Sequence, residues 1–105
     1  MSKILVPTDF SPAAENALEL ACQIATIGNQ EIELLHIMGA KSEGLLKNVG
    51  RNLDELEPYL DEICQKAKED KAVNASFRIE AGNILNTIPE IAGEYEVSLV
   101  IMGTH

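Results

Sequence analysis

Cysteine is scarce in this chain, and long apolar runs are absent. Neither Cys22 nor Cys64 has a second cysteine or a pair of histidines at the spacing of a zinc site. Both occupy apolar positions of helical patterns, so we expect buried, reduced thiols. The chain has no run of about 18 apolar residues and no apolar signal region at its start, which predicts a cytoplasmic protein without a membrane span.

Positive charge is also scarce. The chain carries 8 lysine and arginine residues against 17 acidic ones, which gives a formal charge of −9. Nucleic acids and anionic membrane surfaces would be repelled at long range, so we do not expect them as partners. The acidic groups at 54–57, 61–62 and 69–70 recur at helical spacing, which predicts a solvated helix face rather than a site.

Known catalytic motifs are missing as well. The sequence contains no nucleophile elbow, Walker lysine loop or HExxH helix. A phosphate-accepting receiver domain would need an aspartate after the third predicted strand, where Ala81-Gly82-Asn83 stands. Asp9 would act as a base only with a partner group that we do not find in the sequence. We therefore expect a protein that is not an enzyme.

Apolar segments and amphipathic segments alternate along the chain. The length of 105 residues and the hydrophobic share of 46% predict one domain spanning residues 1–105. A helical pattern follows each of the first three strand-like segments, which indicates βαβ units and an open parallel sheet of the α/β class. The first and last segments are continuously apolar, as is typical of strands covered on both faces. The predicted strands are 3–6, 32–37, 75–80 and 97–102.

The first helix has a clear start and end. Ser11 can cap it, and Pro12 suits its first position. Small apolar residues then recur every three or four positions, which would let the helix lie close to the sheet, until Gly28-Asn29 ends it. The inward positions are Ala14, Ala17, Leu18, Ala21, Cys22 and Ala25.

The connection between the second and third strands is the longest. It begins with a polar loop at 39–44, and one apolar phase then runs from Val49 to Ala67 through Pro58. We favour a single helix kinked at this proline, and the alternative is a helix that starts near Asp54 with the proline in its first turn. A last helix, ending near Gly93, has four inward residues: Ile84, Leu85, Ile88 and Ile91.

Four segments together resemble the universal stress protein family over the whole chain. They are Lys3-Ile4-Leu5-Val6-Pro7-Thr8-Asp9-Phe10-Ser11, Leu34-Leu35-His36-Ile37, Ala81-Gly82 and Val100-Ile101-Met102-Gly103-Thr104-His105. The resemblance implies a Rossmann-like sheet of strand order 3-2-1-4-5 with helices on both faces, and a homodimer. It also implies that this chain holds the first four strands, in the order 3-2-1-4. The fifth strand and the remaining glycines of the family pattern would follow His105.

One branch of the family binds ATP or AMP at the carboxyl edge of the sheet. In that branch, the aspartate after the first strand contacts the nucleoside, the residue after the second-strand histidine meets adenine through its backbone, and a glycine-rich loop after strand four holds ribose and phosphates. The resemblance therefore implies nucleotide-binding roles for a set of residues that match these motifs. They are Pro7, Thr8, Asp9, Ile37, Met102 and Gly103.

Several alternatives stay open at this point. Asp9 can instead accept N–H groups of its own turn. His36 is predicted to be a semi-buried histidine with its hydrogen bonds satisfied rather than a ligand. The other branch of the family binds no nucleotide and acts as a dimeric interaction module. We also expect either self-association through an uncovered apolar edge at 99–102 or a longer parent polypeptide.

Overall fold

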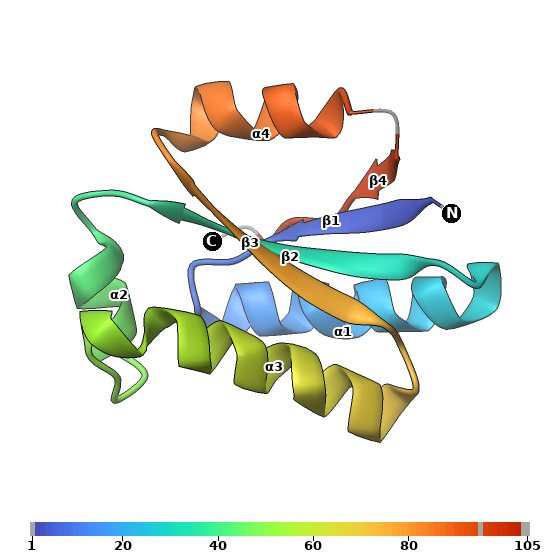
Figure 1. Ribbon diagram of the computed structural model, residues 1–105, viewed down its shortest axis with the longest axis horizontal. Coiled ribbons are helices and arrows are strands. Elements are labelled where there is room, and N and C mark those ends of the chain that lie inside the picture. Colours follow the sequence, from blue (N-terminus) through green and yellow to red (C-terminus); the bar gives the residue numbers. More distant parts are fainter. Residues whose placement is uncertain (1, 95, 104–105) are drawn as a thin grey trace.

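Four parallel strands form a single sheet at the centre of the computed structural model, which describes residues 2–94 and 96–103 (Figure 1). Their order is β3-β2-β1-β4, and each neighbouring pair is parallel. The predicted fold class and the predicted order 3-2-1-4 are confirmed. The strands are β1 (Lys3–Pro7), β2 (Glu31–Met38), β3 (Ala75–Ala81) and β4 (Val97–Val100).

Helices cover both faces of this sheet, as predicted. Helices α1 (Pro12–Gly28) and α3 (Leu56–Lys71) lie on one face, and α4 (Ile84–Ala92) lies on the other (Figure 1). A short helix, α2 (Ser42–Lys47), follows β2. Among residues 2–94 and 96–103, no helix has the length and apolar character needed to cross a bilayer.

Local signals in the sequence explain where α1 begins and ends. The Ser11 hydroxyl accepts the Ala14 N–H at 3.1 Å, and Pro12 takes the first helical position. Asn29 ends the helix in the left-handed conformation, with φ of 52°. The small stripe is buried against the sheet as predicted, except that Leu18 is only partly buried.

The prediction of one helix kinked at Pro58 is wrong, and the alternative is correct. Residue Gly50, with φ of 76°, interrupts the helical path after α2. A capping box then forms, because the Glu55 carboxylate accepts the Asn52 N–H at 3.1 Å. A 3₁₀ turn at Leu53–Glu55 leads into α3, and the proline occupies the first turn of that helix.

The two faces of the sheet have cores of unequal size. The larger core lies under α1 and α3 and includes Cys22 and Cys64, which are buried free thiols as predicted. Burial raises the pKa of the Cys64 thiol to about 11. The smaller core is Leu5, Leu35 and Ile91 under α4.

Helix α4 buries less of its apolar stripe than predicted. Ile88 and Ile91 pack onto the smaller core, whereas Ile84 and Leu85 are 54% and 85% exposed. The prediction that all four point inward is therefore wrong. A helix buries only the side chains that meet a covering partner, and the first turn of α4 meets none among the described residues.

Candidate functional site

The carboxyl ends of β1 and β4 lie next to each other at the point where the strand order reverses. Strands β2 and β3 lie on one side of β1, and β4 lies on the other. The two helices that follow β1 and β3 cover opposite faces (Figure 1). In open α/β sheets, ligands bind in the crevice that such a reversal creates outside the carboxyl ends.

The structure brings five of the six predicted site residues to this edge. Pro7 ends β1, and Thr8 and Asp9 follow it in the loop to α1. Leu5 is opposite Val100 in the register, so Met102 continues level with Pro7. Their roles in binding a ligand stay a prediction.

Ile37 lies farther along the same edge, on β2. Pro7 is opposite Leu35, so Ile37 is two residues beyond the level at which β1 ends. Its side chain is half-buried and packs against the smaller core. The role of its backbone in meeting adenine, which the resemblance implies, stays a prediction.

Gly103 packs directly against the first turn of α1. A Cβ atom at this position would collide with the carbonyl carbon and oxygen of Ala13, and it would lie 2.8 Å from the Ala14 nitrogen. Only glycine fits such a close approach of two backbones. The last described residue of the chain therefore lies beside the loop that carries Asp9. Thr104 and His105, the other residues of the predicted bend, are outside the described residues.

The loop after β1 is fixed by its own side chains. The Asp9 carboxylate accepts the Ser11 N–H at 3.0 Å, and the Thr8 hydroxyl accepts the Phe10 N–H at 3.1 Å. These bonds hold Phe10 at φ of 64°, a conformation that non-glycine residues seldom adopt. The turn role anticipated as the alternative for Asp9 is confirmed.

His36 ties this loop to β2 and α2. Its Nδ1 lies 3.1 Å from the Thr8 carbonyl oxygen, and its Nε2 lies 3.0 Å from the Ser42 hydroxyl. A carbonyl only accepts, so Nδ1 carries the proton and Nε2 accepts the hydroxyl proton. Burial lowers the pKa of this imidazole, against the opposing effects of the Thr8 carbonyl and Asp9. The prediction of a satisfied histidine is confirmed, and the side chain is fully buried.

Sequence reasoning missed the structural role of Phe10. Its ring stacks on His36 with centroids 4.9 Å apart and contacts Tyr59 at 5.2 Å. The Arg51 guanidinium lies over the Tyr59 ring, 4.6 Å from its centroid. These contacts anchor the loop to α3. The one available signal was an aromatic residue directly after the aspartate, between a strand and a helix cap.

The site has no arrangement suited to metal-dependent or nucleophilic chemistry in the part of the chain that the structure describes. Residues 2–94 and 96–103 contain no group of three His, Cys, Asp or Glu side chains placed to hold a metal ion. Both nitrogens of His36 are engaged, and both thiols are buried. The loop at this edge is held by hydrogen bonds from its own side chains.

Known proteins of similar sequence and structure include universal stress proteins. Residues 1–105 match the family model of the Universal stress protein family. Universal stress protein MJ0577 from Methanocaldococcus jannaschii is 31% identical, and the alignment covers 98% of this chain and 76% of that protein.

Two solved structures share the fold. Universal stress protein UspA from Lactobacillus plantarum superimposes with a TM-score of 0.74 at 23% identity, covering 99% of this chain and 79% of the other. A universal stress protein in complex with cAMP gives a TM-score of 0.70 at 22% identity, covering 95% and 74%. The family match and the archaeal relative lead to one conclusion: this chain belongs to the universal stress protein family.

Proposed function

We propose that the carboxyl edge between β1 and β4 binds an adenine nucleotide, ATP or AMP, and that the protein acts as a regulator rather than as an enzyme. The observation that carries this proposal is the contact of Gly103 with the first turn of α1. It puts Gly103 beside the loop of Asp9, so the ends of two adjacent strands lie close enough to contact one ligand.

The residues at this edge suit the nucleoside half of such a ligand. A carboxylate at Asp9 accepts hydrogen bonds from ribose hydroxyls or an adenine amine. Pro7 and Thr8 shape the loop, while Ile37 and Met102 offer backbone groups. Gly103 lets the bend lie close to the first turn of α1, which brings its backbone near the loop of Asp9. By resemblance, the phosphate contacts belong to glycines that follow His105 in the family pattern.

Two further observations support this reading. The similar structure solved with cAMP holds an adenine nucleotide. Both nitrogens of His36 are engaged in hydrogen bonds, so this imidazole is not free to act as a general base at the edge. Any ATP hydrolysis by the full-length protein would then be slow and incidental, and binding would act by changing the partners of the protein.

The direct test is to denature the purified protein and identify the released small molecules by mass spectrometry, followed by calorimetric titration with AMP. The variant Asp9→Asn keeps an amide oxygen for the Ser11 N–H while removing the charge, and we expect it to weaken AMP binding about tenfold or more. The control Asp54→Asn changes the same charge at an exposed position outside the edge. Absence of adenine nucleotide and of AMP binding would favour the non-nucleotide interaction module.

We also propose a cytoplasmic homodimer. Among the described residues, β4 is an edge strand, and the nearby Leu99 and Met102 side chains are 40% and 46% exposed. Such an apolar edge pairs readily with a second chain. Light scattering after gel filtration should give twice the chain mass, and Leu99→Lys should shift the protein toward the monomer. A monomer at all concentrations would contradict the dimer.

A further inference from the structure

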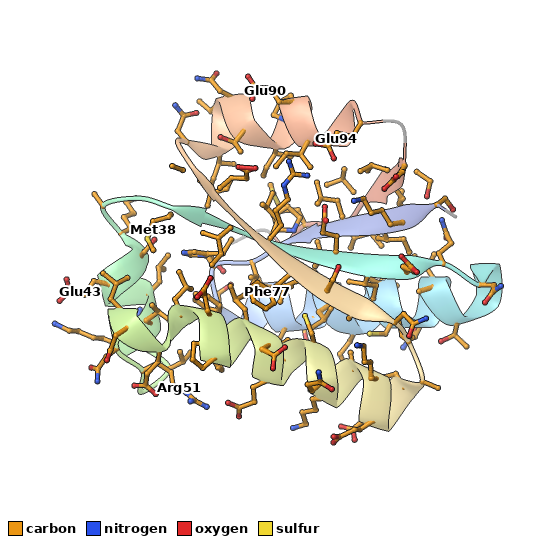
Figure 2. All side chains as sticks on the ribbon, in the orientation of Figure 1. Met38, Glu43, Arg51, Phe77, Glu90 and Glu94 are labelled. Carbon is orange, nitrogen blue, oxygen red and sulfur yellow. The ribbon has the colours of Figure 1, made fainter. Side chains whose placement is uncertain are left out.

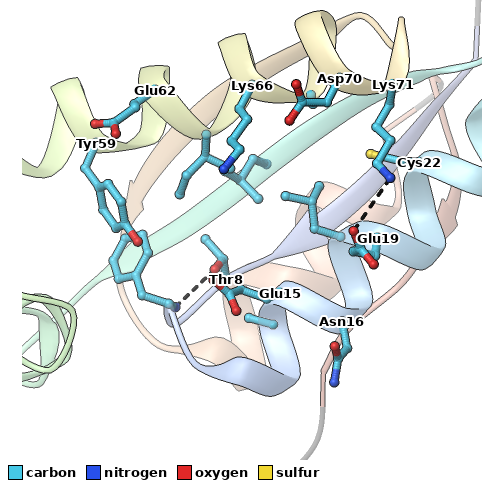
Figure 3. A pocket seen from close by; sticks show the side chains of 16 residues that line it. Thr8, Glu15, Asn16, Glu19, Cys22, Tyr59, Glu62, Lys66, Asp70 and Lys71 are labelled. Carbon is cyan, nitrogen blue, oxygen red and sulfur yellow. Dashed lines mark hydrogen bonds and ion pairs between the residues drawn. The ribbon is translucent and has the colours of Figure 1, made fainter.

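An open groove of about 510 Å³ runs between α1 and α3 on the face opposite α4 (Figure 3). Its floor is apolar and comes from Phe10, Leu34 and Cys22. Its walls include Leu18 from α1 and Ile63 from α3. The volume lies within the roughly 300–1,000 Å³ of protein ligand pockets. Asp9 and Gly103 do not line the groove, although Thr8 and Phe10, on either side of Asp9, do.

The groove is elongated along the helices. Its lining on α3 extends from Tyr59 to Lys71, which corresponds to about 18 Å at the helical rise of 1.5 Å per residue. One end is bounded by Phe10 and Tyr59, whose rings are in contact. The occupant is therefore long and narrow, and about three helical turns would fill the length.

Both walls of the groove carry negative charge. Glu15 and Glu19 lie along α1, and Glu62 and Asp70 lie along α3. Two lysines from α3 offset half of this charge, and Glu62 also pairs with Arg51 at 2.9 Å, which leaves a small net negative charge on the lining of a chain that carries −9. The combination of an apolar floor with acidic walls favours an occupant that is apolar on one side and basic on its flanks.

The groove also selects a backbone conformation. It lies between two helices and has no free strand edge, so an extended peptide would leave its N–H and C=O groups unpaired over the apolar floor. An α-helix satisfies these groups internally and presents side chains at positions i, i+3, i+4 and i+7. We propose that this groove binds a basic amphipathic helix of a partner protein.

An ion pair bridges the two walls of the groove at the end near Lys71. The Lys71 ammonium reaches across to the Glu19 carboxylate at 3.7 Å, and Figure 3 shows this bridge between α3 and α1. Both side chains are about half exposed, so the bridge stabilises the protein little and opens readily. A basic side chain of the docked helix would take the place of this lysine on Glu19.

The test uses the full chain and a labelled 14-residue helical peptide with leucine at i, i+3, i+4 and i+7 and lysine elsewhere, followed by fluorescence anisotropy. Glu15→Gln with Asp70→Asn should weaken binding about fivefold. The matched control is Glu57→Gln with Asp61→Asn. It also removes two negative charges, one from the first turn of α3 and one from farther along α3, and neither residue lines the groove. Leu18→Gln should weaken binding about tenfold, whereas Leu20→Gln, which is outside the groove, should not.

Removing the lysine of the Lys71–Glu19 ion pair should have the opposite effect on peptide binding. Lys71→Ala should strengthen peptide binding about two- to threefold, because it frees Glu19 and removes a positive charge that repels the basic peptide. Lys47→Ala removes another exposed lysine, which pairs with Glu43 on α2, and it should have no such effect.

Three outcomes would overturn the proposal. One is equal binding of a peptide of the same composition with leucine and lysine scrambled. Another is equal weakening by the groove and control variants. The third is a set of amide shifts in an NMR titration that falls outside the groove lining. The groove variants change Glu15, Leu18 and Asp70, and the nucleotide variant changes Asp9, which does not line the groove. AMP titration and peptide titration of these variants therefore test the two proposals separately.

Discussion

The two faces of the sheet differ in how they are stabilised. The face under α1 and α3 carries the larger core, and Phe77 points from β3 toward α3 on this side (Figure 2). The face under α4 has three buried apolar residues and a network of charges that includes Glu94. Apolar burial therefore stabilises mainly one face, while the other depends on paired charges.

The charge network on the α4 face is partly buried. Lys3 bonds Glu33 at 3.1 Å, and Arg78 bonds Glu94 at 2.9 Å and Glu80 at 3.1 Å. The second Glu33 oxygen is buried without a hydrogen bond, and it lies 3.7 Å from the arginine. Partly buried pairs of this kind add little net stability when intact, but losing one partner leaves the other uncompensated.

The largest expected effect compares two neighbouring residues of β2 that face opposite ways. Leu34 is 1% exposed in the larger core, and Leu35 is 0% exposed in the smaller one. Leu34→Ala should destabilise the protein by about 3–5 kcal/mol, and Leu35→Ala by about 2–3 kcal/mol, because the thinner layer relaxes more easily into the cavity. Urea unfolding of both variants measures the difference. Equal losses would remove the distinction between the two faces.

The next largest effect concerns His36, a buried polar residue on the face of the sheet covered by α1 and α3. His36→Gln should destabilise the protein by about 1–3 kcal/mol at pH 7.5, since one of two buried hydrogen bonds is lost. The native pKa of this histidine is below its ordinary value of 6.5, so below that pH the unfolded chain binds more protons. Wild-type stability should fall as the pH drops through this window. The variant should lack that component, and a parallel pH profile would contradict the account.

A smaller loss is expected on the α4 face. Arg78→Ala removes the cation near the buried Glu33 oxygen that lacks a hydrogen bond, while Lys3 still pairs with the other oxygen, and it should cost about 1–2 kcal/mol at pH 7. The hydrogen bond from Arg78 lowers the pKa of Glu94 below 4.5, so this stabilisation is present above that pH and is lost on acidification. The difference from wild type should therefore shrink at pH 3.5. Arg51→Ala, on the other face, should have a smaller effect.

The smallest effect is at the exposed first turn of α4. Leu85→Gln should change stability by less than about 0.5 kcal/mol, as should Ile27→Gln on α1, because the two side chains are 85% and 88% exposed. Chemical denaturation measures both. A loss above about 1 kcal/mol at Leu85 alone would mean that this turn is covered in solution, for example by a second chain.

The parallel sheet was predictable because apolar strands and amphipathic helices alternate at clear intervals, whereas the strand order and the helices on both faces came from the family resemblance. The path of the chain between β2 and α3 was not predicted correctly. The apolar phase through Pro58 looked continuous, but the positive φ of Gly50 and the Asn52 capping box stop the chain before α3. Periodicity records which face is apolar and says little about local breaks.

The candidate site was only partly accessible to sequence reasoning. Family motifs and the strand ends gave Asp9 and Gly103, because parallel order brings those ends together. The contact between Gly103 and Ala13 depends on how closely α1 lies to the sheet, and the stacking of Phe10 on His36 depends on a loop conformation. Both follow from three-dimensional packing, which no local pattern encodes.

The central claim is that the loop after β1 and the bend after β4 form one ligand site. An NMR titration of the labelled protein with AMP tests it most directly. The account predicts that the amide signals of Asp9 and Gly103 both shift and follow a single dissociation constant. AMP that shifts neither signal, or that shifts them with different constants, would contradict the claim.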